Sequence, residues 1–174
     1  EFFHEVGFAV VGGLSEAAAQ DLAGKSFVQD IQQNFLIEFD PGIEFSAALE
    51  VGDLPESPEN PELAGRFPWQ WNMRAIDADD AWAAGYLGSS EVTVAILDTG
   101  IDYTYPDLVG LVDLSRSISF VPEDDVYVEY FFPGAHPVAD IHIHGTHVAA
   151  TVASNAYIAA GVTSKTTLMG VKVC

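Results

Sequence analysis

The sequence predicts an α/β fold with a parallel sheet, preceded by part of a smaller α+β domain. Residues 92–97 (VTVAIL) form a continuous apolar run rich in β-branched residues, which is typical of a strand buried on both faces. Residues 144–156 (HGTHVAATVASNA) have the composition of a helix, and residues 167–173 (TLMGVKV) form a second apolar run. Buried strand, helix and buried strand in this order favour a parallel arrangement.

The first 40 residues predict a separate strand, helix and strand. GFAVVGG (residues 7–13) is an apolar run that ends in glycines. Ser15 is a suitable N-cap for an alanine-rich helix over LSEAAAQDLAG, and Gly24 is a suitable end for it. FVQDIQQNFLIEF (residues 27–39) contains enough aromatic and β-branched residues for one or two strands.

Residues 41–66 differ from the segments on both sides. They carry prolines at positions 41, 55, 58 and 61, several carboxylates and few large apolar residues. Proline excludes a continuous helix or a central strand, so we expect a solvated linker that is open to proteolysis. This divides the chain into an α+β part (1–40), the linker, and a second domain (67–174).

Within the second domain, DADDAWAAGY (residues 77–86) predicts a short helix that begins with carboxylates and ends near Gly85. Residues 113–139 predict an acidic loop, in which EDDVYVE (residues 123–129) is a solvated insertion. The chain starts at Glu1, without a methionine, and stops at Cys174 directly after an apolar run. Ends of proteins rarely fall inside core strands, so we expect an internal part of a longer chain.

The charge of the chain excludes some classes of partner. Six basic residues stand against 26 acidic ones, for a formal net charge of −20. Such a surface repels nucleic acids and anionic membranes, and it suits cationic substrates, calcium or a salty medium. No apolar window approaches the length of a membrane span. The single cysteine, Cys174, excludes a disulfide framework.

Asp98 is the first candidate for a functional residue. It follows the run VTVAIL, and functional side chains in parallel sheets lie just beyond the carboxyl ends of strands. AILDTG around it resembles the active-site signature of aspartic proteases, which need two such aspartates. The chain has no second D-T-G and has Ile101 where a small residue is usual, so this interpretation is not favoured.

Three histidines, His142, His144 and His147, form a second candidate. Their H-x-H-x-x-H spacing resembles the first zinc site of metallo-β-lactamase-like hydrolases, which carry an aspartate where this chain has Thr146. A helix that begins near His144 cannot present all three side chains on one face. A zinc-dependent hydrolase therefore remains a less favoured alternative.

Two motifs together favour a third interpretation. D-T-G-I-D (residues 98–102) and H-G-T-H-V-A (residues 144–149), in this order, resemble the first two active-site motifs of the subtilisin-like serine proteases, or subtilases. The resemblance extends to YPDL, to Asp140 and to LMGVKV, and residues 1–40 resemble the latter part of the family's inhibitory propeptide. It implies a subtilisin-like catalytic domain whose C-terminal part is absent from this chain.

The resemblance implies a serine endopeptidase that is secreted and made as a zymogen, with its own propeptide as an intramolecular inhibitor and proteins or peptides as substrates. We expect the processing site within the linker, residues 41–66. His144 would be the general base, and Asp98 would fix its tautomer and stabilise the imidazolium. No serine of the chain stands in the G-T-S-x-A context of the family's nucleophile, so we expect that serine, like any signal peptide, outside this chain. Ile143 and Ala150 depart from the family pattern. The alternative is a catalytically inactive subtilase-fold binding protein.

For the remaining histidines and for Asp107 we expect structural roles or, for Asp107, calcium binding. We expect His147 to be a packed structural histidine and His142 to be an ordinary loop residue. By resemblance, Asp107 in YPDL matches a carboxylate that helps to hold calcium in many subtilases, although the loop NAYIAA (residues 155–160) offers only Asn155 as a further side-chain oxygen. Asp107 is therefore either a ligand of a structural calcium ion or a turn carboxylate, and the chemistry itself requires no cofactor.

Overall fold

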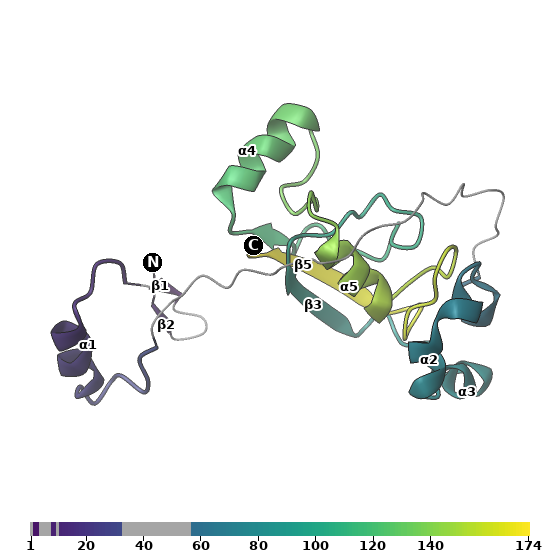
Figure 1. Ribbon diagram of the computed structural model, residues 1–174, viewed down its shortest axis with the longest axis horizontal. Helices are drawn as coiled ribbons and strands as arrows, with labels where there is room; N and C mark the ends of the chain where they lie inside the picture. The colour runs from purple at the N-terminus through teal and green to yellow at the C-terminus, as the bar shows by residue number, and fades with distance from the viewer. Residues whose placement is uncertain (1, 4–7, 10, 33–56) are drawn as a thin grey trace. The chain divides into compact units, whose positions relative to one another are not determined.

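The computed structural model describes residues 2–3, 8–9, 11–32 and 57–174 (Figure 1). The chain divides into two compact units, Glu1–Gly42 and Ile43–Cys174.

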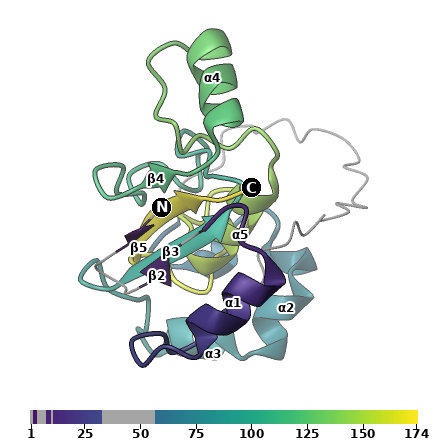
Figure 2. The same cartoon turned by 90° about the vertical axis from the view of Figure 1, so that its left-hand side faces the viewer.

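The first unit contains the predicted helix. Strands β1 (Phe2–Phe3) and β2 (Phe8–Ala9) pair antiparallel, and α1 (Glu16–Ala23) follows (Figure 2). The Ser15 hydroxyl accepts a hydrogen bond from the Ala18 N–H at 3.3 Å, which confirms the expected N-cap. Residues 27–32 form no strand, and the rest of the expected strand region, 33–39, lies outside the described residues.

The second unit is built on a parallel sheet, as predicted. β3 (Thr93–Asp98) and β4 (Ile118–Ser119) both pair with β5 (Thr167–Lys172), so the strand order is β3-β5-β4. Both pairings are parallel, and Asp98 lies opposite Lys172 in the register. The carboxyl ends of β3 and β5 therefore meet at one edge of the sheet, where functional residues are expected.

Helix α5 (His144–Val152) covers one face of the sheet and lies against β3 (Figure 1). The core between them is apolar and includes Ile96, Ile101, Leu108, Ala149, Ala153 and Leu168. On the opposite face of β3 the Leu97 side chain is 65% exposed. The prediction of a strand buried on both faces is therefore wrong for the described part of the chain, because α5 covers only one side.

A second apolar core lies among short helices that precede the sheet. These are η1 (Pro61–Leu63), η2 (Phe67–Trp69), α2 (Trp71–Ala75) and α3 (Ala78–Ala83). Trp82 is central to this core: its ring meets that of Phe67 edge-on at 5.6 Å, and its indole N–H donates to the Val162 carbonyl at 2.9 Å. The predicted helix over DADDAWAAGY is thus α3, and its apolar side joins the core.

The expected linker does not remain solvated over its second half. Residues 57–66 pack against the segment that follows α5, and Ala64 is buried. Their backbone N–H groups donate to carbonyls there, in the pairs Ser57 to Asn155, Gly65 to Tyr157 and Arg66 to Ile158. The expectation of a solvated segment is wrong for residues 57–66, because three-residue helical turns around the prolines bring apolar side chains into the core. Residues 41–56 lie outside the described residues.

The acidic insertion is a helix rather than a loop. Helix α4 (Pro122–Phe131) begins with a proline and three carboxylates in its first turn, a pattern that suits the positive end of a helix. It projects away from the sheet (Figures 1 and 2). Asp124 anchors it, because one carboxylate oxygen lies 3.0 Å from the Lys172 ammonium and 3.2 Å from Nε2 of His142. The expectation of a purely solvated insertion is therefore wrong for Asp124.

Within the described residues, helices are too short or too polar for any of them to cross a membrane.

Replacing Trp82 by alanine should destabilise the second unit by about 3–5 kcal/mol, because the change removes a large buried ring and leaves a cavity. The exposed tryptophan Trp71 is the matched control: Trp82 is 6% exposed and Trp71 is 76% exposed. Trp71→Ala should change the free energy of unfolding by less than about 0.5 kcal/mol. Urea unfolding followed by circular dichroism measures both values, and equal effects would contradict this assignment of the core.

Candidate active site

Asp98 and His144 lie at the ends of two elements that meet. Asp98 is the last residue of β3, and His144 is the first residue of α5. Nδ1 of His144 lies 2.7 Å from Oδ1 of Asp98, and the same oxygen accepts the Thr99 N–H at 2.8 Å. The Asp98 side chain is mostly buried, whereas the His144 ring is nearly half exposed. The carboxylate is thus held on the protein side of the ring.

The short contact fixes the hydrogen-bonding roles of the ring nitrogens. A carboxylate can only accept hydrogen bonds, so Nδ1 of His144 must carry the proton that it shares with Asp98. In a neutral ring, Nε2 then carries no proton and is the nitrogen that can accept one. An imidazole in this tautomer can take a proton from another group at Nε2, and Asp98 stabilises the imidazolium that results.

Two glycines permit the close approach of the two elements. Gly100 has a φ of +117°, and a Cβ there would lie 2.5 Å from the Val138 carbonyl oxygen. At Gly145 a Cβ would clash with the Gly100 carbonyl and would lie 3.1 Å from Cβ of Asp98. Any side chain at Gly145 would therefore push the first turn of α5 away from β3 and lengthen the contact between Asp98 and His144.

The other two histidines do not join this pair. His142 makes its ring contact with Asp124, and His144 makes its own with Asp98. The described part of the chain contains no group of three or more His, Cys, Asp or Glu side chains that could hold a metal ion. The His147 side chain is exposed, so the expectation that it is packed is wrong: the sequence placed it on the helix but did not show which face α5 presents to the sheet.

Comparison with known proteins shows the family of the chain. Residues 89–174 match the Subtilase family. This segment begins just before β3, includes both Asp98 and His144, and ends with β5. The chain belongs to the subtilase family.

Individual relatives match over a longer part of the chain. The minor extracellular protease Vpr of Bacillus subtilis is 36% identical over 120 residues, which are 69% of this chain and 14% of that protein. The major intracellular serine protease of the same species is 32% identical over 72% of the chain and 32% of its own length. The thermophilic serine proteinase of Bacillus sp. AK1 is 30% identical over 85% of the chain. The matches thus cover about a third or less of the first two proteins.

The hydrogen bonds of the Asp107 carboxylate in this subtilase do not fit a calcium site. Its side chain is 1% exposed. Its two oxygens accept three backbone N–H groups at 2.7–3.0 Å, from Tyr157, Ile158 and Ala159. Three of the roughly four acceptor positions of the carboxylate are thus taken by N–H donors, and calcium needs six to eight oxygen ligands. Of the two expectations for Asp107, the geometry favours the turn carboxylate.

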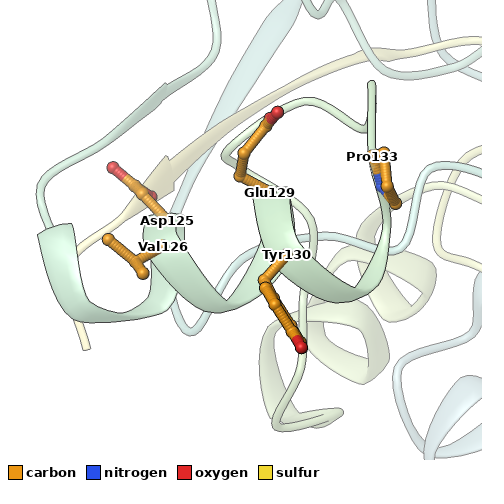
Figure 3. A pocket seen from close by; sticks show the side chains of 5 residues that line it. All are labelled: Asp125, Val126, Glu129, Tyr130 and Pro133. Atoms are coloured by element: carbon orange, nitrogen blue, oxygen red, sulfur yellow. The ribbon is translucent and has the colours of Figure 1, made fainter.

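A hollow on the surface of the subtilase does not include the pair formed by Asp98 and His144. It lies along α4 and has a volume of about 640 Å³. Its lining residues are Asp125, Val126, Glu129, Tyr130 and Pro133 (Figure 3). It is open to solvent and includes neither Asp98 nor His144. The hollow is therefore separate from the candidate active site.

Sequence reasoning placed Asp98 and His144 but missed the polar residues that connect their loops. In the sequence, Asp140 stands out only through the family pattern, and nothing marks Thr99 and Thr146 as hydrogen-bonding residues. The carboxylate of Asp140 accepts from both threonine hydroxyls, at 3.0 and 2.6 Å. One feature of the sequence could have indicated this contact. The expected helix has no polar residue at its N-cap position, and the carboxylate of Asp140 lies a few residues before it.

Replacing Asp107 by asparagine should lower the free energy of unfolding by about 2–4 kcal/mol, because an amide nitrogen cannot accept the N–H groups that surround it. Asp80→Asn, an exposed change in the first turn of α3, is the control and should have an effect below about 0.5 kcal/mol. A calcium chelator should leave the thermal midpoint of the unsubstituted protein unchanged. A midpoint that falls on chelation, and that no longer responds in Asp107→Asn, would restore Asp107 as a calcium ligand.

Proposed function

We propose that this chain supplies the aspartate and the histidine of an Asp-His-Ser triad in a serine endopeptidase. The observation that carries the proposal is the 2.7 Å contact between Nδ1 of His144 and Oδ1 of Asp98, in a chain that belongs to the subtilase family. The contact leaves Nε2 of His144 as the proton acceptor, on a ring that is half exposed.

Each residue has a defined role in the proposed reaction. A serine hydroxyl attacks the peptide carbonyl carbon while Nε2 of His144 takes the hydroxyl proton. The imidazolium is stabilised by the carboxylate of Asp98, and it then gives its proton to the leaving amine. The serine itself comes from a segment outside this chain, because no serine of the chain has the G-T-S-x-A context. The chemistry requires no cofactor.

The rest of the proposal concerns the biology of the enzyme. The N-terminal unit is the end of an inhibitory propeptide, and the enzyme is made as a zymogen, secreted, and acts on proteins or peptides. One relative is named an extracellular protease, which supports secretion, whereas another is named an intracellular protease. The net charge of −20 supports a partner that is neither a nucleic acid nor a membrane.

The competing function is a subtilase-fold protein that binds without cutting. Such a protein has no chemical reason to keep Asp98 and His144 in hydrogen-bonding contact. The two functions differ in whether a serine-directed reagent labels the protein. A zinc-dependent hydrolase based on the three histidines has less support, because His142 and His144 contact different carboxylates.

Substitution of either member of the pair should abolish activity in the full-length protein. His144→Ala removes the base and should lower kcat by about 10⁶-fold, whereas Asp98→Asn stabilises the wrong tautomer and should lower kcat by about 10⁴-fold. Labelling by a fluorophosphonate probe should fall in parallel. The measurements are the rate of peptide hydrolysis and the extent of probe labelling.

His147→Ala is the matched control, since His147 lies on the same helix with an exposed side chain. This variant should keep nearly full activity. Equal losses in His144→Ala and His147→Ala would contradict the proposed roles, and absence of labelling in the unsubstituted protein would favour the binding protein.

Processing of the zymogen should leave a mature enzyme whose first residue lies between positions 41 and 57. Proteases need an accessible, extended backbone, and residues 57–66 have N–H groups in hydrogen bonds with the segment after α5. The hydroxyl of Ser164 also donates to the Pro58 carbonyl at 2.6 Å, which ties this segment down. N-terminal sequencing of the mature enzyme gives the position, and a first residue beyond position 57 would contradict the prediction.

A further inference from the structure

The carboxylate of Asp140, close to the pair formed by Asp98 and His144, accepts five hydrogen bonds. Oδ1 accepts from the backbone N–H groups of His142 at 2.8 Å and Ile143 at 3.0 Å, and from the Thr99 hydroxyl at 3.0 Å. Oδ2 accepts from the N–H of Thr146 at 2.9 Å and from its hydroxyl at 2.6 Å. Five donors thus converge on one side chain.

These bonds replace the missing cap of α5. The residue at the N-cap position is Ile143, which has a φ of +76° and no side-chain acceptor. The first N–H groups of a helix have no partner within the helix and need an acceptor. Asp140 accepts the N–H of Thr146, and the Thr99 hydroxyl accepts the N–H of Gly145 at 2.9 Å. The position of the first turn, which carries His144, therefore depends on Asp140 and Thr99.

The same network reaches the loop that follows Asp98. Thr99 donates its backbone N–H to Asp98 and its hydroxyl to Asp140. Thr146, which also donates to Asp140, accepts the N–H of Asp102 on its hydroxyl at 2.9 Å. Asp140 is therefore in contact, through one hydroxyl on each side, with the loop that carries Asp98 and with the helix that carries His144.

The network also keeps Asp140 ionised. Partial burial raises the pKa of this carboxyl group, but hydrogen bonds from Thr146, from the His142 N–H and from Thr99 outweigh burial and lower the pKa below its usual value. An ionised carboxylate accepts on both oxygens, which all five donors require. At neutral pH the network is therefore complete.

We propose that Asp140 is a positioning residue, which sets the distance and orientation between the His144 ring and Asp98 without touching either side chain or a substrate. The proposal rests on the proposed function, because positioning matters for catalysis only if His144 transfers a proton. It predicts that loss of an acceptor at position 140 moves the ring while the binding surface for a substrate stays in place. A misplacement of about 1 Å can cost about 100-fold in rate.

The test compares Asp140→Asn with the unsubstituted full-length protein. The amide keeps the size of the side chain but cannot accept from two oxygens, so kcat should fall about 10- to 100-fold, with KM changed by less than about threefold. The ¹H NMR resonance of the His144 Nδ1 proton, shared with Asp98, should shift or broaden. Asp113→Asn is the matched control: Asp113 also accepts an N–H and a hydroxyl, from Ser115, but belongs to an exposed turn.

A second pair of variants keeps the test decisive if Asp140→Asn does not fold. Thr99→Ser retains the hydroxyl that contacts Asp140 and Gly145, whereas Thr99→Val removes it at similar size. Serine should preserve kcat and the Nδ1 resonance, and valine should change both. Equal values for the two variants would overturn the proposal, as would a folded Asp140→Asn protein with unchanged kcat and resonance.

The outcomes also separate this inference from the proposed function. If the unsubstituted protein neither hydrolyses peptides nor reacts with a fluorophosphonate, the endopeptidase proposal fails. The Nδ1 resonance of His144 still reports whether Asp140 and Thr99 position the ring. A resonance that shifts in Asp140→Asn and Thr99→Val then supports the positioning role alone.

Discussion

The junction between the loop after β3 and the first turn of α5 is the constraint on which the described site depends. Asp98 and His144 are separated by 45 intervening positions in the sequence, and only the meeting of these two elements brings their side chains to 2.7 Å. Parallel strands place Asp98 at the carboxyl edge of the sheet, and the crossover returns α5 to the same edge. A hydrogen bond of this length requires that both backbones be held to within a few tenths of an ångström.

The junction combines two glycines, which have no side chain, with a dense set of hydrogen bonds. Glycines at positions 100 and 145 remove the Cβ atoms that would separate the elements, which lets the backbones approach but also weakens local preference for one conformation. The hydrogen bonds of Asp140 and Thr99 supply the missing rigidity, since they fix the first-turn N–H groups of α5. Close approach and rigidity therefore come from different residues, and a site of this kind needs both.

The sequence predicted the elements whose signals are local and missed features that depend on distant contacts. The parallel strands, α5 and the Ser15 cap follow from apolar runs and capping residues, and Asp98 and His144 follow from two short motifs. The composition of residues 57–66 suggested solvent exposure, but the segment packs because the turn after α5 offers carbonyls to it. Likewise, nothing near His147 indicates which face of α5 meets the sheet. Hydrophobic periodicity is weak in a helix made largely of alanine, valine and threonine.

Lys172 shows how an ionic contact outside the pair supports the same edge of the sheet. Its side chain is fully buried at the end of β5, opposite Asp98 in the register, and its ammonium group donates to the Ala139 carbonyl at 2.9 Å. A buried ammonium is costly unless it is paired, and Asp124 of α4 provides the partner at 3.0 Å. Because the Ala139 carbonyl directly precedes Asp140, this ion pair joins α4 and β5 to the segment that positions His144. The acidic helix, which composition alone assigned to solvent, is thus part of the support for the junction.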